Sequence, residues 1–135
     1  MVLIVCVDDH NGMMFNHRRQ SQDRVLRADI LELTDGKKLW MNAYSEKQFA
    51  ESDTARIRVD ETFLDAAGDG EFCFVENADV SGCVERIEEI YLYRWNRDYP
   101  ADVYFPVDLS VWKCVETKEF AGSSHEKITR ERYTR

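Results

Sequence analysis

The sequence predicts a single α/β domain with a central, mostly parallel sheet and an antiparallel hairpin at its C-terminal end. Val2–Val7 and Glu71–Glu76 are apolar runs without polar alternation, as in strands buried on both faces of a parallel sheet. Strand and helix patterns alternate up to Trp95, and two strand patterns then follow one another. The chain, residues 1–135, has the length of one domain, so we expect a sheet of about seven or eight strands with both apolar runs in its middle.

Composition and charge indicate a soluble globular protein of the cytoplasm. Hydrophobic residues make up 44% of the chain and charged residues 33%, and the net charge is −8. Such a field repels nucleic acid and anionic membranes, so neither is expected as a partner, while the oligomeric state stays open. No segment approaches the roughly 20 apolar residues of a membrane span, and Met1–Val7 is too short for a signal peptide.

The cysteines and carboxylates do not predict a metal site. Cys6, Cys73, Cys83 and Cys114 form no C-x-x-C pair, and no histidine stands at metal-site spacing from them, so we expect four reduced thiols in the core. Asp8 and Asp9 follow the first strand and could hold a metal, but adjacent carboxylates more often begin a turn.

The first part of the chain predicts a strand, a polar loop and a helix. Asp8–Gly12 has the composition of a turn, and the polar loop continues to Gln20. Ser21 can cap a helix in which Leu26, Ile30 and Leu33 recur at helical spacing, and Asp35-Gly36 ends it.

The rest of the chain adds shorter elements. We expect short helices capped at Ser45 and over Glu61–Ala67 and Val80–Ile87, with a loop over Asp98–Asp108 and a turn at Ser123-Ser124-His125. The further predicted strands are Lys38–Asn42, Ala55–Val59, Ile90–Trp95, Trp112–Glu119 and Lys127–Tyr133.

Several local strings, in this order, resemble the dihydrofolate reductase family over nearly the whole chain. Asp9-His10-Asn11-Gly12-Met13-Met14 is similar to the family's Asp-x-Asn-Gly-x-Ile turn, and Asp102-Val103-Tyr104-Phe105-Pro106 to its Asp-Thr-x-Phe-Pro motif. Glu32-Leu33-Thr34 to Met41, Ile90-Tyr91-Leu92 and Trp112 also fall at the family's spacing. The resemblance implies a dihydrofolate-reductase-like three-layer sandwich.

The residues that make that family a reductase are replaced. Leu26 stands where the resemblance places the catalytic carboxylate, and Asp23 lies one turn earlier, so it could substitute only in a shifted helix register. Arg19-Gln20-Ser21 replaces the family's Leu-Pro-Trp, and Phe15 replaces the glycine that closes its active-site loop.

The cofactor side departs in the same way. Asn42-Ala43-Tyr44-Ser45 replaces the family's phosphate-binding Gly-Arg-x-Thr, and Glu76-Asn77 replaces its Gly-Gly pair. Glu76 also adds a negative charge where the family holds an anion. No cofactor is therefore expected, and NADPH is not expected to bind in the usual pose.

The candidate site is a crevice around the polar stretch from Asn16 to Asp23. Arg18 or Arg19 could clamp a carboxylate or phosphate there, although the stretch could also be a solvated loop that offsets an acidic surface. His125 carries an imidazole beside two serine hydroxyls, but we expect it to be a surface turn residue. The predicted ligand-binding residues are Asn16, His17, Arg18, Arg19, Asp23, Asn42, Tyr44, Glu76, Asn77 and Tyr93.

Three classes of function follow. The leading hypothesis is a protein of this fold without reductase activity that binds a small anionic ligand or a protein partner through the crevice. The second is an enzyme with altered chemistry, such as a reductase with another cofactor pose. The third is an RNA-directed activity, because short bacterial sequences similar to this one are sometimes described as ribonuclease Z. That chemistry needs a His-x-His-x-Asp-His cluster, which the sequence lacks.

Overall fold

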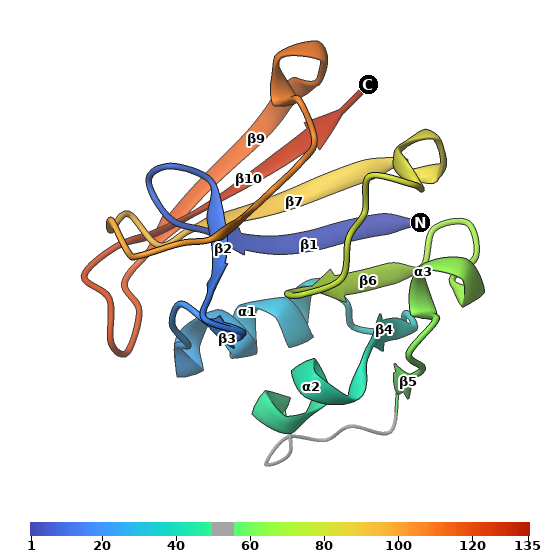
Figure 1. The fold of residues 1–135 in the computed structure, drawn as a ribbon, viewed down its shortest axis with the longest axis horizontal. Helices are drawn as coiled ribbons and strands as arrows, with labels where there is room; N and C mark the ends of the chain where they lie inside the picture. The colour runs from blue at the N-terminus through green and yellow to red at the C-terminus, as the bar shows by residue number, and fades with distance from the viewer. Residues whose placement is uncertain (50–55) are drawn as a thin grey trace.

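The structure is a computed structural model that describes residues 1–49 and 56–135, and a seven-stranded sheet runs through its centre (Figure 1). In spatial order its strands are β5 (Ile57–Val59), β4 (Leu39–Met41), β6 (Phe72–Val75), β1 (Val2–Val7), β7 (Glu89–Arg94), β10 (Ile128–Thr134) and β9 (Lys113–Phe120). The strands from β5 to β7 pair in parallel, and β10 pairs antiparallel with both β7 and β9. The predicted mixed sheet with a C-terminal hairpin is confirmed.

The two apolar runs lie in the middle of this sheet, as predicted. β1 pairs with β6 on one side, where Leu3 lies opposite Cys73, and with β7 on the other, where Leu3 lies opposite Ile90. Because both neighbours of β1 are strands and both its faces are covered, Leu3, Ile4 and Val5 are fully buried.

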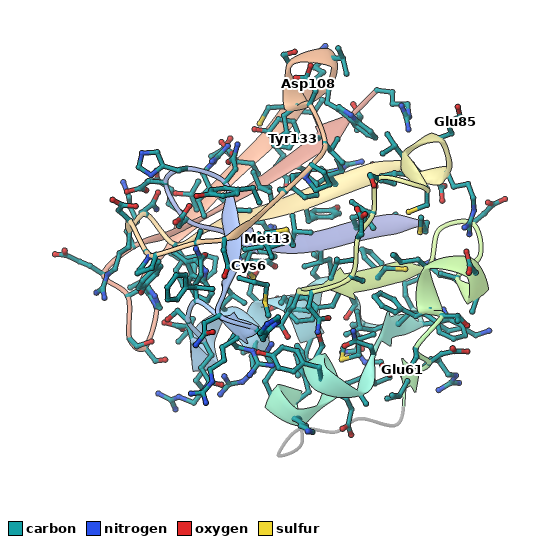
Figure 2. All side chains as sticks on the ribbon, in the orientation of Figure 1. Cys6, Met13, Glu61, Glu85, Asp108 and Tyr133 are labelled. Carbon is teal, nitrogen blue, oxygen red and sulfur yellow. The ribbon has the colours of Figure 1, made fainter. Side chains whose placement is uncertain are left out.

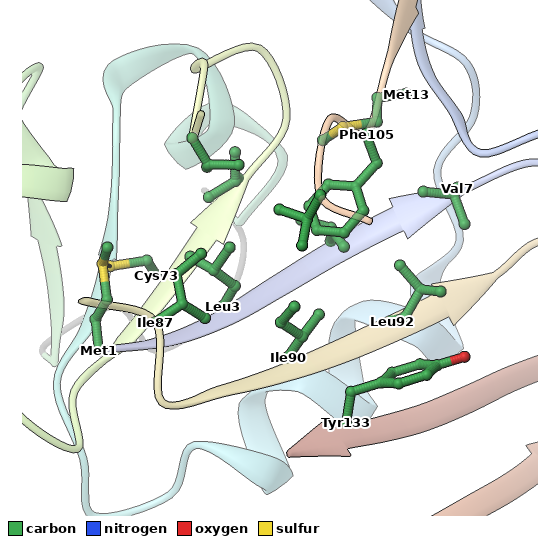
Figure 3. Close-up of a cluster of buried hydrophobic side chains, with 14 of the residues drawn as sticks. Met1, Leu3, Val7, Met13, Cys73, Ile87, Ile90, Leu92, Phe105 and Tyr133 are labelled. Carbon is green, nitrogen blue, oxygen red and sulfur yellow. Dashed lines mark hydrogen bonds between the residues drawn. The ribbon is translucent and has the colours of Figure 1, made fainter. Parts of the chain in front are cut away.

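Side chains alternate between two cores, one on each face of the sheet. Leu3 and Val5 point into a core that also receives Phe63 from α3 (Phe63–Ala66) and Phe105 from the segment before β9 (Figure 3). Ile4 points into the other core, which α1 (Arg24–Leu33) covers with Leu26 and Ile30. These two covered faces give the expected three layers.

A second, three-stranded sheet lies where the sequence predicts only loops. It consists of β3 (Arg18–Arg19), β2 (Gly12–Phe15) and β8 (Val103–Tyr104). Asn16 and His17 join β2 to β3 with φ of 51° and 62°, the left-handed conformation of a tight hairpin turn. Such a turn usually contains glycine. Because Asn16 and His17 stand there without one, the sequence pattern did not reveal the hairpin.

The helices begin at other residues than predicted, because neighbouring side chains cap them. Asp23, not Ser21, caps α1, and Asn42, not Ser45, caps α2 (Ala43–Glu46), which continues into η1 (Lys47–Phe49). The predicted helix over residues 80–87 is wrong. Only η2 (Val84–Arg86) forms there, after the Asp79 carboxylate has accepted the Ser81 N–H in a turn.

Smaller differences concern the remaining segments. η3 (Leu109–Val111) precedes β9, and residue 55 of the predicted strand 55–59 lies outside the described residues. All four cysteines are free thiols, but Cys114 is exposed, so its predicted burial is wrong. None of the described helices has the length and apolar composition needed to cross a membrane.

Candidate functional site

Three parallel strands bring polar residues to one edge of the sheet. β1, β4 and β6 end there, and Asp8, Asn42 and Glu76 follow them directly. Ligands of open α/β sheets bind outside the carboxyl ends of the strands, so this edge is the first place to look for a site. The β2–β3 hairpin crosses it, and in Figure 2 Met13 of β2 lies beside Cys6 near the end of β1.

Arg19 and Glu76 form an ion pair that closes this edge. The guanidinium of Arg19 donates to both carboxylate oxygens of Glu76, with Nε–Oε2 at 2.8 Å and Nη2–Oε1 at 3.1 Å. The Glu76 side chain is only 9% exposed. A paired, largely buried carboxylate of this kind is neutralised by its partner, so Glu76 does not present the repulsive charge that the sequence suggested.

Tyr44 completes the closure. Its hydroxyl accepts the backbone N–H of Arg19 at 2.8 Å, and its carbonyl accepts from Nη2 of Arg19 at 3.2 Å. The guanidinium carbon also lies 4.5 Å from the centre of the Tyr44 ring. These contacts fix β3 against the first turn of α2.

Asn42 and Asn77 form a second contact along the same edge. The Asn42 side chain donates from Nδ2 to Oδ1 of Asn77 at 2.7 Å and accepts the Ser45 N–H at 3.1 Å. Ser45, 1% exposed, has a buried hydroxyl with no partner among the described residues. The hydroxyl that a phosphate-binding helix start would offer is therefore covered.

The space enclosed between the Arg19–Glu76 pair and α1 is very small. A cavity of about 10 Å³ lies between the hairpin, β1, β6 and α1, and its walls include Cys6, Met13 and Leu26. Such a volume holds a single water molecule at most. Burial raises the pKa of the Cys6 thiol well above its ordinary value, so Cys6 is not a ready nucleophile.

The tip of the hairpin carries the most polar of the predicted residues. Asn16, His17 and Arg18 are all exposed, and the Asn16 N–H donates to Asp102. Arg18 has no carboxylate at ion-pair distance among the described residues, and it lines a surface hollow of about 240 Å³ together with Phe15 and Tyr99. Arg18 is therefore the uncompensated cation of this stretch.

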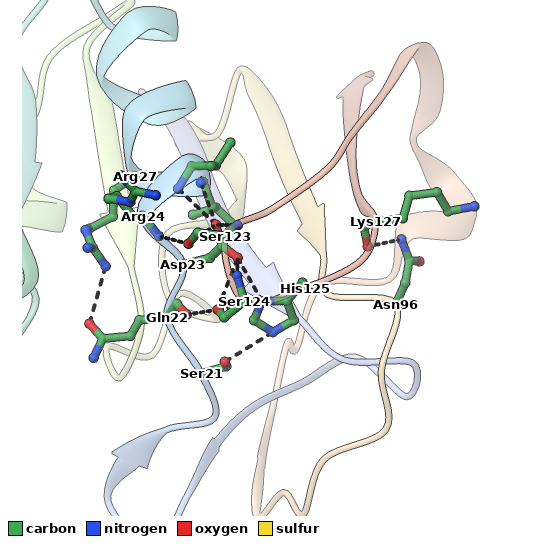
Figure 4. Close-up of polar contacts among 12 residues, drawn as sticks. Ser21, Gln22, Asp23, Arg24, Arg27, Asn96, Ser123, Ser124, His125 and Lys127 are labelled. Atoms are coloured by element: carbon green, nitrogen blue, oxygen red, sulfur yellow. Dashed lines mark hydrogen bonds and ion pairs between the residues drawn. The ribbon is translucent and has the colours of Figure 1, made fainter.

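Asp23 lies at the other side of the crevice and is fully engaged (Figure 4). Its Oδ1 accepts the Val25, Leu26 and Ser123 N–H groups at 2.9, 3.2 and 2.9 Å, and its Oδ2 accepts the Ser124 N–H at 2.8 Å. Burial alone would raise the pKa of Asp23, but these bonds hold that pKa well below its ordinary value. Asp23 thus links α1 to the β9–β10 turn and is not a free acid.

His125 is buried beside Asp23, which makes the predicted surface position wrong. Its Nδ1 lies 3.0 Å from Oδ2 of Asp23, and its Nε2 lies 2.9 Å from the Tyr99 hydroxyl and 3.2 Å from that of Ser21. The ring stacks on Trp95 with 4.4 Å between centres. With 1% of its side chain exposed, His125 ties three loops together.

Tyr93 is also buried, and it meets a carboxylate that sequence reasoning missed. Its hydroxyl donates to Asp29 at 2.6 Å, and Arg130 and Lys118 donate to the same carboxylate at 2.8 and 3.1 Å. Burial would raise the pKa of Asp29, but these three donors lower it. Asp29 falls three residues after Leu26 and directly before Ile30, within the apolar stripe of α1. A carboxylate at such a position could have indicated a buried polar contact.

The predicted residues therefore fall into three groups. Arg19, Tyr44 and Glu76 touch one another beside the Asn42–Asn77 pair; Asn16, His17 and Arg18 are at the hairpin tip; Asp23 and Tyr93 serve the α1 side. Among the described residues no group of three or more His, Cys, Asp or Glu side chains could hold a metal ion.

Comparison with known proteins identifies the fold. No family model and no curated protein matches this sequence. The structure is similar to that of dihydrofolate reductase from Enterococcus faecalis complexed with NADP(H) and RAB-propyl, with a TM-score of 0.71 and 12% identity. The match covers 99% of this chain and 95% of that one. The predicted fold class is confirmed; at this identity the likeness shows the fold alone.

The engagement of Asp23 makes stability depend on pH. We expect Asp23→Asn to lower the free energy of unfolding by about 2–3 kcal/mol at pH 7. The ordinary pKa is 3.8 and the folded one is lower, so this contribution is complete above about pH 5 and is lost as the pH falls below 3.8. Urea unfolding from pH 7 to pH 3 should therefore show the gap between wild type and variant narrowing. Asp35→Asn, at an exposed carboxylate, is the control, and a gap that is constant with pH would contradict the assignment.

Proposed function

We propose, from the premise that this chain has the dihydrofolate reductase fold, that it is not a reductase and that it binds a small anionic ligand at the rim of its crevice. The observation that carries the proposal is the pairing of Arg19 with Glu76. That pair occupies the edge where the strands end. Arg18, the residue before Arg19 in the hairpin, has no carboxylate at ion-pair distance among the described residues.

The residues present do not fit NADP(H), which the similar reductase binds. Arg19 comes from the protein's own hairpin and uses its donors on Glu76 and Tyr44. The Ser45 hydroxyl is buried and the Asn42–Asn77 bond spans the neighbouring position. Opening this edge would break a largely buried ion pair. The cofactor is therefore opposed because protein side chains occupy its place, not because Glu76 repels it.

The place of the catalytic carboxylate also supports this proposal. Leu26 is buried in the core, Asp23 is used as a helix cap, and Asp29 is held by Tyr93 and Arg130. Each carboxylate near the start of α1 thus has its oxygens occupied by protein donors and a lowered pKa, whereas a general acid needs its proton near neutral pH.

An anionic ligand is supported by the surroundings of Arg18. The hollow beside it combines Arg18, and Arg19 already paired with Glu76, with the side chains of Phe15, Gln20 and Tyr99. This composition suits a small carboxylate with an apolar body. A protein partner is the second candidate, because Phe15 and Tyr104 are 47% and 53% exposed near the same hairpin.

Cofactor binding gives the first test. We expect no saturable change in NADPH fluorescence up to tens of micromolar and no turnover of dihydrofolate above background. The reason is that each charge-assisted contact missing from the site is worth about 1.5–3 kcal/mol, so two or three remove most of a micromolar affinity. Saturable binding, or turnover that depends on protein concentration, would end the non-reductase proposal.

Arg18 and Arg19 should behave differently when they are replaced. Arg18→Ala should weaken the binding of benzoate, measured by chemical-shift titration, by about tenfold while thermal stability is unchanged. Arg19→Ala should lower stability by about 3 kcal/mol, because it leaves Glu76 buried without its partner. Binding of benzoate that is equal in wild type and Arg18→Ala would remove the rim site.

A further inference from the structure

A second cationic surface adjoins Asp23 and its partners Ser123, Ser124 and His125, which we call the Asp23 cluster. Arg24, Arg27 and Lys47 line a hollow of about 480 Å³, together with Gln22, Gln48 and Ser124. We call it the α1 hollow. Two of its cations come from the first turns of α1 and the third from η1, which follows α2. Figure 4 shows Arg24 and Arg27 beside the Asp23 cluster.

Most of the described arginines have a carboxylate or a backbone carbonyl as a partner, whereas Arg24 and Arg27 of the α1 hollow, like Arg18, do not. Arg19, Arg94, Arg130 and Arg132 form ion pairs with carboxylates, and Arg56, Arg86 and Arg135 donate to backbone carbonyls. Within the described part of the chain, neither Arg24, Arg27 nor Lys47 has a carboxylate at ion-pair distance; the Arg27 guanidinium reaches only the Gln22 side chain, at 3.4 Å. A protein of net charge −8 thus gathers in one place three cations that have no carboxylate at ion-pair distance among the residues that the structure describes.

The acid in the wall of the hollow does not neutralise them. Asp23 is 2% exposed, and its oxygens face the amides of α1 and of the β9–β10 turn and the ring of His125. The same bonds use the first N–H groups of α1, and the Arg24 N–H donates to Ser123. Attraction for an anion must therefore come from the three side chains, not from the end of the helix.

We propose that the α1 hollow binds the phosphate group of a small phosphorylated metabolite. A doubly charged phosphate matches several converging cations better than a single carboxylate does, and a guanidinium can donate to two phosphate oxygens at once. Apart from the engaged Asp23, the other wall residues carry amides and hydroxyls, which suit a hydrophilic body such as a sugar. The site goes beyond the proposed function, since it shares no residue with the hollow beside Arg18.

The test uses three probes and nuclear magnetic resonance on labelled protein. Ribose 5-phosphate should shift the amide signals of Arg24, Gln48 and Ser124 in a saturable way, and the affinity should fall as NaCl is raised. Inorganic phosphate should bind the same residues, and more weakly if the sugar contributes. Citrate should compete poorly with either.

Matched variants locate the site. Arg24→Gln and Lys47→Gln each remove one charge and keep a polar side chain, and each should weaken ribose 5-phosphate by about tenfold. Lys37→Gln, an exposed lysine after α1, and Arg18→Gln, at the rim site, should leave it unchanged. Thermal melting of all four variants shows whether the fold is intact.

Three results would overturn the inference. They are the absence of saturable shifts at millimolar ribose 5-phosphate, an affinity that Arg24→Gln and Lys47→Gln do not change, and tighter binding of citrate than of either phosphate probe. If Arg18→Gln alone abolished the shifts, the rim site would stand and the α1 hollow would fall, so the two proposals fail separately.

Discussion

The ion pair between Arg19 and Glu76 lies at the edge where β1, β4 and β6 end, and much of this surface is arranged around it. Arg19 also donates to Tyr44, so the short strand β3 is fixed to both Glu76 and the first turn of α2. Removing one member of a buried ion pair typically lowers the free energy of unfolding by about 3–5 kcal/mol, because the other charge stays buried without a partner or water. The edge of the sheet where these strands end is therefore occupied by the protein's own side chains.

Two further carboxylates stabilise the opposite side of the sheet in the same way. Asp23 joins the start of α1 to the β9–β10 turn, and Asp29 joins the middle of α1 to Tyr93 and to Arg130 of β10. Asp23 caps the first helix and Asp29 lies within it, and their partners follow 64 to 102 residues later in the chain. The two carboxylates at and within the first helix thus hold it against the C-terminal hairpin.

The sequence predicted the sheet well because burial on two faces leaves a local signature. Val2–Val7 has it throughout, and the helical spacing of Leu26 and Ile30 identified the face of α1 that packs. The periodicity predicted the α/β class, and the strings that resemble the dihydrofolate reductase family, Asp102–Pro106 among them, added the specific three-layer fold.

The site was harder to predict, because its contacts join distant residues. The sequence around His125 does not indicate its contact with Asp23, which lies 102 residues earlier. The hairpin turn at Asn16 and His17 lacks the glycine that would have predicted it. The sequence predicted that the polar residues at the strand ends lie along one edge of the sheet. It did not predict the Arg19–Glu76 and Asn42–Asn77 contacts. Asp29 was detectable, since a carboxylate within an apolar helical stripe requires a partner.

The closure of the crevice depends most directly on the energetic coupling between Arg19 and Glu76. A double-mutant cycle with Arg19→Met, Glu76→Gln and the combined variant, measured by urea unfolding at pH 7, gives that coupling free of each residue's other contacts. We expect a coupling of about 1–3 kcal/mol, with the double variant more stable than the sum of the single losses implies. A coupling indistinguishable from zero would show that the pair does not hold the crevice closed and would contradict the account.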